Sequence, residues 1–104
     1  MGGRGSSGGT AIGGGAGSKL SASRKETITN GIKNHTKEQN DRAEANYKRS
    51  IAKEREVVEN ASAYIRSGHI KNTSDPWFQG HVESLNSLNA QFKFFKKERK
   101  RLGR

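Results

Sequence analysis

The chain of 104 residues carries a formal net charge of +10, and hydrophobic side chains make up 29% of it. This length allows at most one small domain, and so few apolar residues exclude a large core. The sequence has no cysteine, which excludes disulfides and thiolate metal sites. No apolar run approaches the ~18 residues of a membrane span, so a membrane is not expected as a partner.

The chain opens with a glycine-rich head, in which residues 1–17 hold nine of the glycines. Glycine loses more backbone freedom on folding than any other residue, and nothing in this segment offers burial in return. Residues 1–22 are therefore predicted to be disordered. Order is expected from Ser23, because Ser23 and Glu26 have the spacing of a capping box, and a short helix that frays is predicted over 23–34.

A second capping box, Thr36 with Gln39, predicts the start of a long helix over residues 36–67. Apolar side chains then recur at spacings of three, four and seven residues, which marks a narrow stripe on one helix face. Gly68 is suited to the left-handed conformation that ends helices. The members of this stripe are Tyr47, Ile51, Val58, Ala61 and Ile65.

The third predicted helix spans residues 75–102. Asp75 is a good N-cap, and Pro76 is tolerated at the first helical position. Two long amphipathic helices joined by a short connector should fold back on each other. We therefore predict an all-α protein with one helical domain over 23–104, built on an antiparallel two-helix hairpin. Its second apolar stripe contains Phe78, Val82, Leu85, Leu88, Phe92, Phe95 and Leu102.

Each predicted helix has a narrow apolar face. Such a hairpin needs further cover, either from the first helix or from a second copy of the chain, so the sequence leaves a homo-oligomer open.

The positive charge is concentrated at the two ends of the chain. Residues 1–35 carry +4 and residues 76–104 carry +5, whereas residues 36–75 carry only +1. This asymmetry favours an anionic partner, which is nucleic acid, an acidic protein surface or a membrane, and of these the membrane is the least expected. The candidate binding residues lie in the last helix, and they are Lys93, Phe94, Lys96, Lys97, Arg99, Lys100 and Arg101.

The aromatic residues near this cluster have two interpretations. Phe92 and Phe95 share the apolar seam and are expected in the core, whereas Phe94 lies about 200° around the helix from Phe92 and can face a ligand. Trp77 either closes the end of the hairpin or serves as an exposed anchor for another protein. The basic cluster itself has an alternative role, because cations in the last turns also complement the helix dipole.

The sequence gives little support to other chemistry. Gly13 to Lys19 lacks the spacing of a phosphate loop, and the three histidines are far apart. No nucleophile motif or paired-carboxylate arrangement is present, so no enzyme activity, metal or cofactor is expected. Met1 to Ser6 fits the loose pattern for N-myristoylation, which would make the chain a lipid-anchored protein.

The first nine residues, Met-Gly-Gly-Arg-Gly-Ser-Ser-Gly-Gly, resemble the glycine-rich start of small proteins encoded in bacteriophage head-gene clusters. The resemblance implies a phage origin and a location in the cytoplasm of the host bacterium, before any incorporation into a virion. The resulting hypothesis is a small non-enzymatic phage-type accessory protein that binds nucleic acid through its basic C-terminal helix. The alternative is a protein-interaction module, either a head-assembly component or an inhibitor of a host nucleic-acid machine such as a CRISPR effector.

Overall fold

The computed structural model describes residues 20–104. Most of the segment predicted to be disordered, residues 1–19, lies outside the described residues. No strand occurs within residues 20–104, and the predicted all-α class is confirmed. The elements are α1 (Ala22–Asn34), α2 (Lys37–Glu59), α3 (Ala61–Arg66) and α4 (Pro76–Leu102).

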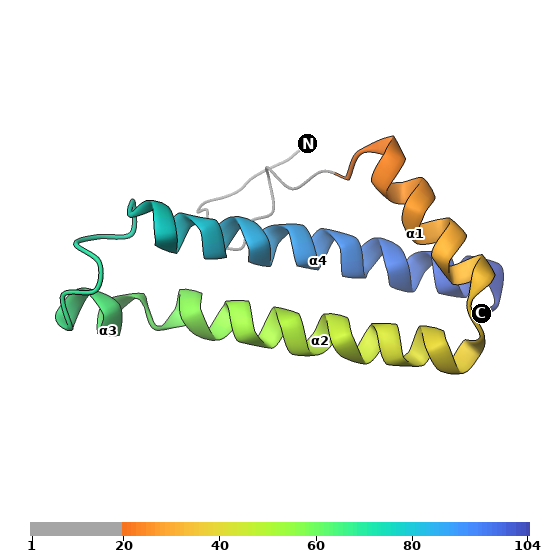
Figure 1. Cartoon of the computed structure of the whole chain (residues 1–104), viewed down its shortest axis with the longest axis horizontal. Helices are drawn as coiled ribbons and strands as arrows, with labels where there is room; N and C mark the ends of the chain where they lie inside the picture. Colours follow the sequence, from red (N-terminus) through yellow and green to blue (C-terminus); the bar gives the residue numbers. More distant parts are fainter. Residues whose placement is uncertain (1–19) are drawn as a thin grey trace.

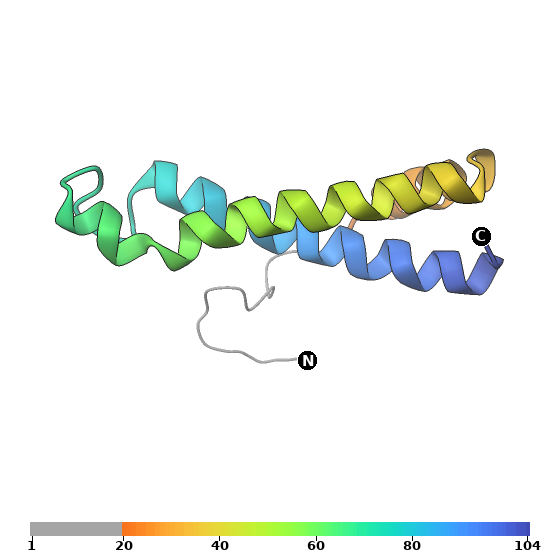
Figure 2. The same ribbon diagram turned by 90° about the horizontal axis from the view of Figure 1, so that it is seen from below.

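The long helices α2 and α4 run antiparallel and lie side by side along most of their length, as Figures 1 and 2 show. The predicted hairpin is therefore confirmed. Helix α1 packs against the C-terminal half of α4, whereas the short helix α3 and the connector lie at the opposite end of the hairpin (Figure 1).

Two of the predicted helix starts are confirmed in detail. Thr36 Oγ1 accepts a hydrogen bond from the Gln39 backbone N–H at 3.1 Å, and Gln39 Oε1 accepts from the Thr36 N–H at 2.8 Å. Asp75 Oδ1 accepts from the Trp77 N–H at 2.9 Å, directly before Pro76. These caps satisfy backbone donors that have no partner inside the helix, which is why local sequence identified both starts.

The predicted capping box at Ser23 is wrong. Helix α1 begins at Ala22, and its N-cap is Ser21, whose Oγ accepts from the Arg24 N–H at 3.1 Å. The preceding residue, Leu20, is half-buried and lines a groove with Phe94 of α4. The cap of α1 therefore lies two residues before the position that the Ser23–Glu26 spacing indicated.

The predicted single helix over residues 36–67 is also wrong, because Asn60 divides it into α2 and α3. The Asn60 side-chain amide donates to the Glu56 carbonyl at 2.8 Å, which is the local competition with helical hydrogen bonding that favours asparagine at helix ends. After this break, the side chains of α3 that face the core differ from those that the stripe predicted. Tyr64 packs against the core, whereas Ile65, which the stripe predicted inside, is 40% exposed.

The core lies between the two long helices, close to the connector. Gly68 has a φ of +81°, as expected for the residue that ends the helix before the connector. Beyond this core, the Tyr47 ring of α2 packs on Phe92 and Phe95, with ring centroids 5.5 and 5.2 Å apart. The buried side chains of the core are Ile51, Val58, Ile70, Phe78, Val82 and Leu85.

Candidate functional site

Four lysines lie on one face of α4 near its C-terminal end. Their positions, 93, 96, 97 and 100, repeat at i, i+3, i+4 and i+7, which places them along a single stripe about 10.5 Å long. All four are exposed, and within residues 20–104 no carboxylate lies within ion-pair distance of any of them. We call Lys93, Lys96, Lys97 and Lys100 the lysine stripe.

One lysine of the stripe, Lys96, contacts an aromatic ring of the α2–α4 interface. Lys96 Nζ lies 4.4 Å from the centroid of the Phe92 ring, a cation–π contact, while Phe92 itself packs on Tyr47. Phe95 is 5% exposed and is therefore buried, as expected, whereas Phe92 is partly buried against the core. Because the contacts of Tyr47 with Phe92 and Phe95 join α4 to α2, the four lysines stand on a helix that is packed in place.

Arg99 has a different environment from the lysine stripe. Its guanidinium donates to Glu44 Oε1 at 3.0 Å and to Asp41 Oδ1 at 2.8 Å, and it also donates to the Arg104 carbonyl. The side chain is only 13% exposed. The charge of Arg99 therefore serves mainly to join the end of α4 to the start of α2.

Arg101 is also paired within the fold. It donates to both oxygens of Glu98, at 2.6 and 2.8 Å, and Thr29 of α1 donates to Glu98 Oε1 at 2.9 Å. The hydrogen bonds from Arg101 are the largest influence on Glu98 and lower the pKa of this carboxyl from 4.5 to about 2, with burial opposing them and Thr29 assisting them. The Arg101 side chain remains 58% exposed.

Two residues that the sequence did not single out hold α1 in place. Arg104 donates from Nε to the Ile32 carbonyl at 3.1 Å and from Nη2 to the His35 carbonyl at 2.6 Å. The fully buried Asn40 amide donates to the Ile32 carbonyl at 3.2 Å and to the Arg104 carbonyl at 3.3 Å. These bonds satisfy carbonyl groups at the end of α1 and fasten it to α2 and α4.

Phe94 lines a groove between the start of α1 and α4. The groove has a volume of about 370 Å³, and Lys25 Nζ lies 5.9 Å from the Phe94 ring centroid. Phe94 is half-buried, so it faces neither the core nor open solvent. Apolar and cationic side chains share the lining of this groove, which consists of Leu20, Lys25, Ala90, Lys93, Phe94 and Lys97.

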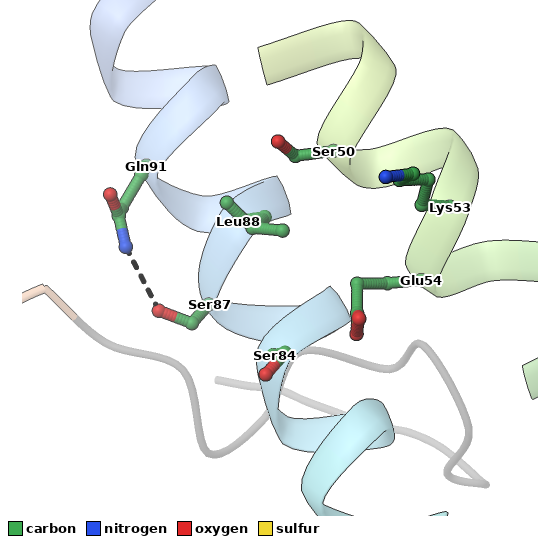
Figure 3. A pocket seen from close by; sticks show the side chains of 7 residues that line it. All are labelled: Ser50, Lys53, Glu54, Ser84, Ser87, Leu88 and Gln91. Carbon is green, nitrogen blue, oxygen red and sulfur yellow. Dashed lines mark hydrogen bonds between the residues drawn. The ribbon is translucent and has the colours of Figure 1, made fainter. Parts of the chain in front are cut away.

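A second cavity, of about 460 Å³, lies between α2 and α4 (Figure 3). Its lining is mostly hydroxyl and amide groups, and Gln91 donates to Ser87 Oγ at 3.0 Å. Glu54 at its edge is paired with His81, whose Nδ1 lies 2.8 Å from the carboxylate. Within residues 20–104, no serine hydroxyl hydrogen-bonds to the His81 ring, and the charges of Lys53 and Glu54 oppose each other, so this cavity favours no charged ligand.

Trp77 closes the connector end of the hairpin, as one of its two sequence interpretations predicted, and it is also partly exposed. It makes edge contacts with the rings of Tyr64, His69 and His81, with centroids 5.2, 4.5 and 4.7 Å away, and it closes the connector end of the hairpin. It is nevertheless 41% exposed, and Ile65 of α3, at the same end of the hairpin, is also exposed.

No protein family, curated protein or solved structure matches this chain. The site therefore has to be interpreted from its own geometry. Within residues 20–104, no cluster of three or more potential metal ligands is present, and no helix is long and apolar enough to cross a membrane.

Proposed function

We propose that this chain is a small accessory protein that binds the phosphate backbone of nucleic acid through the lysine stripe. The observation that carries the proposal is the set of four exposed lysines on one helix face, without carboxylate partners among the described residues. Cations in this state can neutralise phosphates and release their condensed counterions, which is the main source of sequence-independent binding.

The position of the acidic residues supports the same proposal. Asp41 and Glu44 pair with Arg99, Glu98 pairs with Arg101, and Glu54 pairs with His81. None of these carboxylates faces the lysine stripe within ion-pair distance. A phosphate approaching this face of α4 therefore meets four lysines that form no ion pair with a carboxylate of residues 20–104.

The dipole of α4 alone does not account for the stripe. The dipole effect falls off within the last turn of a helix, and Gly103 ends α4 with a φ of +70°. Lys100 lies in that last turn, but Lys93, Lys96 and Lys97 lie before it. Three of the four stripe charges are therefore placed where a dipole gives them little stabilisation.

The proposal includes a bacteriophage origin and action in the cytoplasm of an infected bacterium. Its support is the resemblance of residues 1–9 to the glycine-rich start of proteins from phage head-gene clusters.

The decisive experiment is a titration of the protein with a fluorescently labelled duplex and a labelled single strand, at about 50 and about 200 mM salt. Binding in the micromolar range or tighter at low salt, with a steep loss at high salt, supports the proposal. Absence of binding to both probes at low salt refutes it.

A second candidate function is docking to another protein, as a head-assembly component or an inhibitor of a host nucleic-acid machine. The partly exposed Trp77 and the exposed Ile65 at the hairpin end favour it, because exposed aromatic residues often anchor protein interfaces. Such an interface would persist when salt is raised, and it would be lost in Trp77→Ala. Salt dependence therefore separates the two functions.

A further inference from the structure

We infer that the groove beside the lysine stripe takes an unpaired base of a single-stranded nucleic acid, so that the protein prefers single strands to duplexes. This inference rests on the proposed function and adds the kind of nucleic acid. Its structural basis is the groove between α1 and α4, in which the half-buried ring of Phe94 lies among three lysines.

The groove and the lysine stripe are continuous, because Lys93 and Lys97 belong to both. A strand whose phosphates follow the stripe would therefore pass along the rim of the groove. A base turned inward from that strand would reach the Phe94 ring, while its own phosphates stay near Lys93 and Lys97. Single-strand-binding proteins combine these two elements, a cationic track for the backbone and aromatic rings for the bases.

The chemistry of the lining favours a nucleotide over a purely apolar ligand. Leu20, Ala90 and Phe94 supply apolar surface, but Lys25, Lys93 and Lys97 supply three cations and no carboxylate lines the groove. The volume of about 370 Å³ is within the range of small-molecule sites, roughly 300–1,000 Å³. The matching occupant is therefore planar, partly apolar and flanked by negative charge.

Helix α1 is part of this site. Lys25 Nζ lies 5.9 Å from the Phe94 centroid, and Leu20 stands immediately before the cap of α1. A base in a duplex is stacked between its neighbours and cannot present its face to Phe94 without being unstacked, which costs free energy. Preference for single strands follows from that difference.

The test measures the dissociation constants of the intact protein for a labelled single strand of about 15 nucleotides, for an abasic strand of the same length and for the matching duplex, by fluorescence anisotropy at low salt. Wild type should bind the normal strand more tightly than the abasic strand and the duplex. Phe94→Ala should weaken binding to the normal strand roughly 5- to 150-fold, the usual range for loss of one base–aromatic stack, and leave duplex binding unchanged.

Two variants control for indirect effects. Trp77→Ala removes another partly exposed aromatic residue from α4, about 25 Å away along the helix, and should leave single-strand affinity unchanged. Phe94→Trp keeps a stacking ring and should retain the preference. Circular dichroism shows whether each variant remains folded, and the comparison of normal and abasic strands on wild type needs no variant at all.

Equal affinity of wild type for the normal strand, the abasic strand and the duplex would overturn the inference while leaving phosphate binding by the lysine stripe intact. The inference is also overturned if the groove instead takes an acyl chain, in which case Phe94→Ala would reduce binding of oleate but not of the strand. If wild type binds none of the nucleic acids at low salt, the proposed function fails together with the inference.

Discussion

Replacing the four lysines of the stripe by glutamine gives the sharpest test of where binding occurs. Each neutralised phosphate contributes a slope of about −0.9 to the logarithm of duplex affinity against the logarithm of salt concentration. If Lys93, Lys96, Lys97 and Lys100 each hold one phosphate, their combined slope is about −3.6. Wild type should then lose roughly 150-fold in duplex affinity between about 50 and 200 mM salt.

The quadruple variant should lose most of this dependence, and its binding at low salt should weaken as well. A matched control removes the same charge elsewhere, through glutamine at the exposed residues Lys37, Lys48, Lys53 and Lys71. Both variants lower the net charge from +10 to +6. Anisotropy titrations at four or five salt concentrations, with thermal melts by circular dichroism as a check on folding, give both slopes.

The two variants distinguish a local site from a general effect of charge. Binding through the lysine stripe predicts a flattened slope for the stripe variant and a slope close to wild type for the control. Equal loss of slope in both variants would refute the placement of the site, because the effect would then come from net charge. An unchanged slope in the stripe variant would remove these lysines from the binding mechanism.

Three further predictions concern the residues that hold the basic end together. The pKa of Glu98 is lowered to about 2 in the folded protein, so its contribution to stability is present above about pH 4.5 and is lost as the pH falls toward 2. Glu98→Gln should therefore flatten the dependence of the free energy of unfolding on pH over that range, as measured by urea unfolding. An unchanged pH profile in the variant would contradict the contacts of Glu98 with Arg101 and Thr29. Arg99→Gln should lower the free energy of unfolding by about 1–2 kcal/mol, because two ion pairs are lost, one of them to the largely exposed Asp41. The salt slope of duplex binding should stay near that of wild type. Arg104→Ala should speed amide hydrogen exchange in α1 more than in α2, because the His35 carbonyl loses its Arg104 donor and the Ile32 carbonyl keeps only Asn40 as a side-chain donor. Equal exchange in wild type and variant would show that α1 is held by other contacts.

The fold was predictable where its signals are local. The Thr36–Gln39 capping box, the Asp75 cap and Gly68 each act within a few residues, and all three behave as the sequence indicated. The start of α1 and the break at Asn60 were missed. At the first, Ser21 and Ser23 both offer a capping hydroxyl, and the Ser23–Glu26 spacing favoured Ser23 although the chain uses Ser21. The second depends on a competition between side-chain and backbone hydrogen bonds that spacing alone does not decide.

The candidate site was predictable in outline for the same reason. The spacing of its lysines already places them on one face of a helix, and the separation of Phe94 from the apolar seam is equally local. The pairing of Arg99 with Asp41 joins residues 58 positions apart, and the contact of Lys25 with Phe94 joins α1 to α4. Which cations stay available for a ligand therefore follows from tertiary packing, which composition and periodicity do not contain.

Mapping the contact surface by nuclear magnetic resonance tests the central claim most directly. Labelled protein would be titrated with a short single strand at low salt, and the shifts of its amide resonances followed residue by residue. Binding through the lysine stripe and its groove predicts that the largest shifts fall over residues 90–101 and the first turns of α1. Shifts confined to the hairpin end around Trp77, or no shifts at all, would contradict nucleic-acid binding at the basic end of α4.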